Sequence, residues 1–177
     1  LLKTLYAEVQ LLSGEGRVAG YDLYLRLLKE AARHDLPVYF FGGTPGIAEA
    51  AAEEGRRRWP GLRVVGCRNG YFQAEEEEGI VEAINASGAK MLFAALGAPK
   101  QEQWLDRYAD RLRPSLLMGI GGSFDVLAGK VQRAPKWMQD ARLEWLYRLL
   151  KQPSRLGRMM ALPKFVLAVR REKSQKK

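Results

Sequence analysis

The chain has 177 residues, 47% of them hydrophobic, and a net charge of +9 at pH 7. This length fits one domain with a substantial core. Cys67 is the single cysteine, so an internal disulfide is excluded and a reducing compartment is favoured. We expect Cys67 to be a small buried residue and not a catalytic thiol. His34 is the single histidine, which argues against histidine-based metal sites and Ser-His-Asp triads. No apolar run reaches the roughly 18 residues that cross a bilayer.

Helical and strand patterns alternate along most of the chain. Apolar spacing, prolines such as Pro45 and Pro99 at the first position, and acids in a first turn predict helices over 20–34, 45–58, 75–88 and 99–113. Short apolar runs rich in strand formers predict strands over 36–41, 62–66, 90–96 and 115–122. This alternation with short connections predicts an α/β fold, with a Rossmann-like parallel sheet and helices on both faces.

The C-terminal part has a different character. Residues 135–152 are expected to form one helix, ended by Pro153, with an apolar face that includes Trp137, Leu143, Leu146 and Leu150. We therefore expect an α/β domain over 1–134 and a basic, amphipathic helical appendage over 135–177. The apolar faces are also compatible with a homo-oligomer.

The positive charge is concentrated near the C-terminus. Residues 130–177 contain 14 Lys and Arg against three acids, so the preceding 129 residues carry a net charge of −2. A near-neutral body with a cationic tail indicates a polyanionic partner, which is a lipid surface, a nucleic acid or a phosphorylated substrate.

Three predicted strands end in glycine-containing segments, "FFGGTPG" (40–46), "LGAPKQE" (96–102) and "GIGGSFD" (119–125). Ligands of open parallel sheets bind beyond the carboxyl ends of the strands, and bare backbone N–H groups there bind anions. One such turn is more often only a turn, but three together predict a site for a nucleotide diphosphate. Neither the G-x-G-x-x-G dinucleotide fingerprint nor a Walker P-loop is present.

Five side chains near these strand ends are candidates for ligand contacts. Lys100 suits phosphate charge, and Gln101 suits sugar hydroxyls or a leaving oxygen. Glu102 is either a ligand contact or a capping or dipole partner at the start of its helix. Asp125 suits a base edge or ribose, or else caps a helix over 126–129. Tyr71 suits stacking on a base, or else is an aromatic residue at the rim of the core.

The chain resembles the WecG/TagA/CpsF family of glycosyltransferases from residue 17 to about residue 160. Residues 1–16 do not share the resemblance. The matching text is "RVAGYDL" (17–23), "FFGGTPG" (40–46), "GYF" (70–72), "LGAPKQE" (96–102), "GIGGSFDVLAGKVQRAPKWMQ" (119–139) and "LEWLYRLLKQPSR" (143–155).

The resemblance implies a bacterial enzyme of surface-polymer assembly, as in the linkage unit of wall teichoic acid. Such enzymes move N-acetylmannosamine, or a related sugar, from a UDP-sugar to polyprenyl-diphosphate-linked N-acetylglucosamine, inverting the anomeric centre without a metal or cofactor. They are expected in the cytoplasm, peripheral on the inner face of the cell membrane.

The resemblance also implies residue roles. Tyr71 and Asp125 would hold the uracil, while Arg17 and Gln101 would face the departing diphosphate and the acceptor. The appendage would close over the site at the membrane, with Arg148, Arg155 and Arg158 gripping the lipid diphosphate. The residues expected to contact or leave room for the diphosphate and sugar are Gly42, Gly43, Thr44, Gly46, Gly97, Lys100, Gly121 and Gly122.

The general base is not assigned. Family members carry an N-terminal segment with an "ADG"-like stretch whose Asp is the presumed base, whereas no Asp precedes Asp22 here. Asp22 matches a different motif, and Asp125 is expected to serve the uracil. We therefore expect this chain to lack that segment, which leaves three interpretations: the sequence is a truncated form, another carboxylate substitutes, or the chain is catalytically weak.

Two other classes of protein remain as alternatives. A nucleic-acid-binding α/β module would use the basic tail, although three glycine-rich strand ends are unnecessary for it and no reading motif is present. A nicotinamide-dependent reductase is disfavoured by the missing fingerprint.

Overall fold

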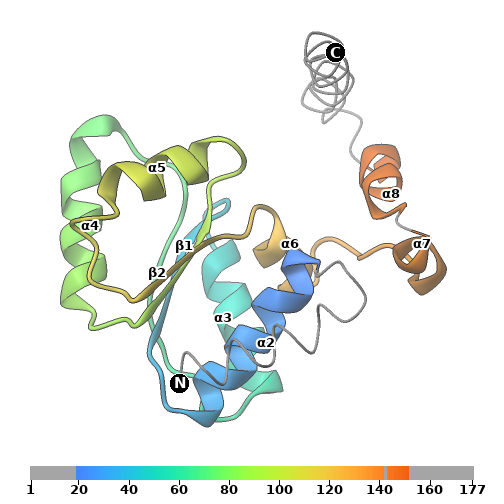
Figure 1. The fold of residues 1–177 in the computed structure, drawn as a ribbon, viewed down its shortest axis with the longest axis horizontal. Coiled ribbons are helices and arrows are strands. Elements are labelled where there is room, and N and C mark those ends of the chain that lie inside the picture. Colours follow the sequence, from blue (N-terminus) through green and yellow to red (C-terminus); the bar gives the residue numbers. More distant parts are fainter. Residues whose placement is uncertain (1–18, 142, 152–177) are drawn as a thin grey trace, which may run out of the picture. The chain divides into compact units, whose positions relative to one another are not determined.

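The computed structural model describes residues 19–141 and 143–151, shown in Figure 1. The chain divides into two compact units between Val131 and Gln132. The first unit contains a sheet and its covering helices, and the described residues of the second form two short helices.

Within the first unit, the sheet consists of β1 (Val38–Gly42), β2 (Val64–Arg68), β3 (Met91–Ala95) and β4 (Leu116–Gly119). The strands are all parallel, in the order β2-β1-β3-β4. The described helices of this unit are α2 (Gly20–Arg33), α3 (Ile47–Arg58), the 3-10 turn η1 (Ala74–Glu76), α4 (Glu77–Ala86), α5 (Lys100–Tyr108) and α6 (Ser123–Leu127). The predicted parallel α/β architecture is confirmed.

The sheet has a hydrophobic core on each face, because successive strand side chains point to opposite sides. Phe40 packs with helices α2, α3 and α6, whereas Phe41 packs with α4 and α5. Figure 1 shows these two helix layers on either side of the strands. All residues of the central strands β1 and β3 are buried, while those of the edge strands β2 and β4 are half-buried.

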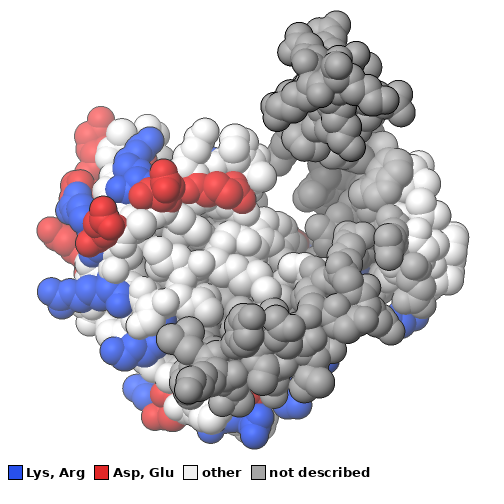
Figure 2. Space-filling model, viewed as in Figure 1, with Lys and Arg blue, Asp and Glu red and all other residues white. Residues whose placement is uncertain are grey.

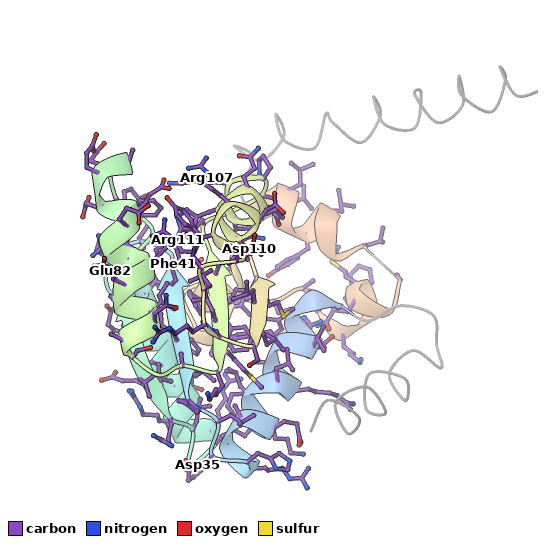
Figure 3. The ribbon with its side chains drawn as sticks, turned by 60° about the vertical axis from the view of Figure 1, so that its left-hand side comes forward. Asp35, Phe41, Glu82, Arg107, Asp110 and Arg111 are labelled. Atoms are coloured by element: carbon purple, nitrogen blue, oxygen red, sulfur yellow. The ribbon has the colours of Figure 1, made fainter. Side chains whose placement is uncertain are left out.

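Ion pairs connect α4 with α5 at the outer edge of one face. Arg107 Nη1 lies 3.0 Å from Glu77 Oε2, and Arg111 pairs with Glu78. Figure 2 shows these mixed charges gathered over α4 and α5, and Figure 3 places Arg107 and Arg111 along α5 and the turn after it. Since the arginines are exposed to solvent, such pairs contribute little to stability.

Element boundaries differ from the predictions where local backbone geometry intervenes. Gly46 caps α3 with a φ of 84°, so Pro45 precedes the helix instead of opening it. The strand predicted over 62–66 lies two residues later, as β2. The helix predicted over 99–113 already ends at Tyr108.

The second unit contradicts the prediction of one helix over 135–152. It contains α7 (Lys136–Asp140) and α8 (Glu144–Lys151). The Leu143 N–H donates to the Met138 carbonyl at 2.7 Å, which closes the end of α7, while the Leu143 carbonyl accepts from the first turn of α8. In the described residues, Trp137 and Leu150 are 65% and 70% exposed. No helix of the described part of the chain is long and apolar enough to cross a membrane.

Candidate functional site

The strand order creates a topological switch point between β1 and β3. From β1 the chain goes to β2 on one side and then crosses to β3 on the other. Helix α3 packs on one face of the sheet, and α4 packs on the opposite face. Ligands of open parallel sheets bind at the carboxyl ends of the strands at such a point.

Backbone contacts join the loops that follow β1 and β2 to the end of β3. The Gly43 N–H donates to the Ala95 carbonyl at 2.9 Å, and the Gly70 N–H donates to the Gly43 carbonyl at 2.8 Å. A Cβ on Gly42 would lie 2.5 Å from the carbonyl carbon of Ala95. The structure therefore brings the predicted residues Gly42 and Gly43 directly against the end of β3, and glycine is required for that approach.

Gln101 attaches the loop after β4 to the same group of loops. Its side-chain Oε1 accepts from the Gly121 N–H at 2.9 Å, and its Nε2 donates to Glu102 Oε1 at 2.7 Å. Gln101 is only 5% exposed. A Cβ on Gly119 would lie 2.7 Å from Gln101 Nε2, so that glycine makes room for the amide. The described contacts of Gln101 thus hold the loop after β4 beside the first turn of α5.

Tyr71 projects from a closely held loop between β2 and η1. Its N–H donates to Asn69 Oδ1 at 2.9 Å, while its side chain is 68% exposed. Glu76 binds both flanks of the loop, accepting from the Gln73 N–H at 2.8 Å and from Arg68 Nη2 at 2.7 Å. The Gln73 N–H, and then Arg68, lower the pKa of the Glu76 carboxyl. The alternative interpretation of Tyr71 as a rim aromatic of the core is wrong.

Phe72 is the aromatic residue of this loop that packs inward. Its ring centroid lies 5.5 Å from that of Phe41, which points from β1 toward the α4 and α5 side (Figure 3). The Lys100 ammonium lies over the Phe72 ring, 4.3 Å from its centroid. Lys100 is therefore fixed beside the Tyr71 loop. Sequence reasoning missed Phe72, although it stands inside the "GYF" segment.

Asp125 lies in the first turn of α6 and is half-buried. Its backbone carbonyl accepts from the Val131 N–H at 3.1 Å. The capping position of α6 belongs to Gly122, so the interpretation of Asp125 as an N-cap is wrong. Gly121, with a φ of 53°, turns the chain from β4 into this helix.

The remaining predicted residues lie in different parts of the chain. Thr44 is exposed in the loop after β1, where its carbonyl accepts from the Ile47 N–H. Gly97, with a φ of 80°, lies in the turn between β3 and α5. Arg148 lies in α8 of the second unit. Arg17, Arg155 and Arg158 lie outside the described residues.

The Cys67 thiol and possible metal ligands also bear on the chemistry. Burial raises the pKa of the Cys67 thiol to about 11, so the thiol is neutral at pH 7 and suits a structural role. Among the residues that the structure describes, no three His, Cys, Asp or Glu side chains are grouped to hold a metal ion.

A family model described as the glycosyl transferase WecG/TagA/CpsF family matches residues 4–177. The match begins before residue 17, so our expectation that residues 1–16 lie outside the resemblance is wrong. It also extends beyond residue 160 and includes the whole second unit. Because the match spans nearly all of the sequence, the chain belongs to the WecG/TagA/CpsF family of glycosyltransferases.

Proposed function

We propose that this protein transfers N-acetylmannosamine, or a related sugar, from a UDP-sugar to polyprenyl-diphosphate-linked N-acetylglucosamine in bacterial surface-polymer synthesis. The acceptor hydroxyl attacks the anomeric carbon with inversion while the bond to UDP breaks. The departing UDP takes the bonding electron pair, and the hydroxyl proton passes to a base that is not assigned. No metal ion participates.

One observation carries the donor half of this proposal. Hydrogen bonds join the loops after β1 and β2 to the end of β3, through Gly43, Gly70 and Ala95. Gln101, in the first turn of α5, holds the loop after β4 through Gly121. The N–H groups that join these loops donate within the protein. What the arrangement offers a ligand is the Lys100 ammonium, held beside the loop whose Tyr71 ring is exposed. A nucleoside diphosphate has the matching chemistry, since it combines a flat base with two phosphates.

The proposal gives each predicted residue a role. Tyr71 and Asp125 hold the uracil, and Lys100 neutralises the diphosphate. Arg17 and Gln101 act at the departing diphosphate and the acceptor. The room for diphosphate and sugar is supplied by Gly42, Gly43, Thr44, Gly46, Gly97, Gly121 and Gly122. In the appendage over 135–177, the lipid diphosphate is gripped by Arg148, Arg155 and Arg158.

Thermal unfolding tests the donor class. UDP and UDP-N-acetylglucosamine are compared with NAD and single-stranded DNA, each at the same concentration. At 100 times its Kd a ligand stabilises the native state by about 2.7 kcal/mol, which for a chain of this size raises Tm by roughly 5–11 °C. The uridine ligands should raise Tm, and NAD and DNA should not. Stabilisation by DNA or NAD alone would refute a UDP-sugar site.

Two substitutions test the uracil assignment. Tyr71→Ala and Asp125→Ala should each weaken UDP binding in calorimetry. Asp110→Ala is a matched control, because Asp110 is an exposed carboxylate after α5, labelled in Figure 3. Equal affinities for all three variants and the unaltered protein would remove Tyr71 and Asp125 from the site.

A transfer assay with lipid-linked acceptor in vesicles tests the second half. Charge reversal at Arg148, Arg155 and Arg158 should reduce acceptor turnover more than UDP binding. Equal losses in both would indicate misfolding instead.

A chelator should leave transfer intact, whereas loss of transfer that a divalent cation restores would contradict the metal-independent mechanism.

A further inference from the structure

Two adjacent aromatic residues of the β2–η1 loop serve different partners. Tyr71 is 68% exposed, whereas Phe72 is half-buried against Phe41. The outward ring is available to a ligand, and the inward ring carries the Lys100 ammonium on its face at 4.3 Å.

The Lys100 ammonium has no carboxylate partner among the described residues. The nearest acid in sequence, Glu102, instead accepts a hydrogen bond from Gln101 Nε2 at 2.7 Å. An aromatic face attracts an ammonium without neutralising it. The charge of Lys100 therefore remains available to an anion, while the Phe72 ring restricts where that charge lies.

This restriction matters because lysine has a long, flexible side chain. Ordering such a side chain on binding costs conformational entropy, and a side chain that is already held loses less. The cation–π contact uses one side of the ammonium and leaves N–H donors on the other side. Lys100 also begins α5, directly after the turn from β3, which is one of the two strands that flank the switch point.

We propose that Phe72 is a positioning residue that holds the Lys100 ammonium ready for the diphosphate of the nucleotide ligand. The proposal rests on the proposed function, since it takes the ligand to be a nucleoside diphosphate. The two aromatic residues of the loop then have different roles. Tyr71 recognises the base, and Phe72 acts on the phosphates through Lys100.

The test compares UDP with uridine, which has the base but no phosphate. Phe72→Leu keeps an apolar side chain against Phe41 but removes the aromatic face, whereas Phe72→Tyr keeps it. Affinity for UDP is measured by calorimetry and affinity for uridine by NMR titration. Phe72→Leu should weaken UDP binding about two- to five-fold, the range that an exposed cation–π contact supports, and leave uridine binding unchanged. Phe72→Tyr should bind both ligands like the unaltered protein.

Lys100→Met supplies the second arm. If Phe72 acts through Lys100, the double variant Phe72→Leu/Lys100→Met should bind UDP no more weakly than Lys100→Met alone. An equal loss for UDP and uridine in Phe72→Leu would show that Phe72 supports the Tyr71 loop instead, and would overturn the inference. An additional loss in the Lys100→Met background would do the same.

The outcomes also separate this inference from the proposed function. If the unaltered protein binds UDP and Lys100→Met weakens it while Phe72→Leu does not, the positioning role is wrong and the donor site stands. If the unaltered protein binds neither UDP nor uridine, the donor site itself is wrong and the role of Phe72 is lost with it.

Discussion

Gly42, the last residue of β1, is predicted to tolerate no side chain. Its φ is 123°, a conformation that residues with a Cβ rarely adopt, and an added Cβ would lie 2.5 Å from both the carbonyl carbon and the carbonyl oxygen of Ala95. The clashing atoms belong to the backbone of the neighbouring central strand. Relief of the clash therefore requires β1 and β3 to separate at the switch point.

The expected cost of Gly42→Ala combines two effects. Forcing an alanine into left-handed backbone costs about 1–2 kcal/mol, and overpacking costs about 1–3 kcal/mol. A combined loss of about 3 kcal/mol lowers Tm by roughly 6–12 °C in a chain of this size.

Two other glycines supply controls that separate these effects. Gly46 has a φ of 84° but nothing within 4 Å of an added Cβ, so Gly46→Ala reports the backbone strain alone. Gly79 lies within α4 with open space around it. Gly79→Ala should raise stability by about 0.5–1 kcal/mol. In thermal unfolding, Tm should therefore fall in the order Gly79→Ala, unaltered protein, Gly46→Ala, Gly42→Ala. A Gly42→Ala variant that melts with or above Gly46→Ala would refute the close approach of β1 to β3.

Replacing Gln101 by Leu should cost about 1–3 kcal/mol, because the Gly121 N–H loses its partner; faster hydrogen exchange at that amide, together with a lower Tm, would confirm it. Cys67 should resist alkylation at pH 8 and react only as the pH approaches 11, the range to which burial raises its pKa. The raised pKa also means that its contribution to stability is complete below pH 8.5 and is lost as pH rises toward 11. Alkylation of the native protein at pH 7 as fast as a free thiol would contradict both statements. Arg111→Gln should change Tm little, since its pair with Glu78 is exposed; a large loss would show a buried role.

The parallel sheet was predictable from the sequence because its central strands are continuous apolar runs. "VYFF" and "MLFAA" have no polar residue to face solvent, and both lie buried on two sides. Glycines at the ends of these runs located the candidate site. The strand order places the switch point between β1 and β3. It depends on which face of the sheet each helix covers, and no local sequence pattern encodes that.

Finer features escaped prediction because they depend on contacts between distant segments. The side chain of Gln101 reaches Gly121, and Lys100 stacks on Phe72 of a different loop. Apolar spacing also continues through 135–152, although the structure has two separate helices there, α7 and α8. Periodicity shows which residues are apolar. It does not reveal a break between two helices when the backbone groups at the break are hydrogen-bonded and the apolar spacing continues.

The position of β1 between β2 and β3 has a consequence for biosynthesis. The Gly43 N–H donates to the carbonyl of Ala95, which lies about 50 residues later in the chain. At a translation rate of roughly 5–20 residues per second, that partner emerges from the ribosome about 3–10 s afterwards. During this interval the apolar strand β1 lacks a neighbouring strand at the edge that β3 later occupies. A nascent chain of this protein should therefore expose the apolar side chains of β1 until β3 is synthesised.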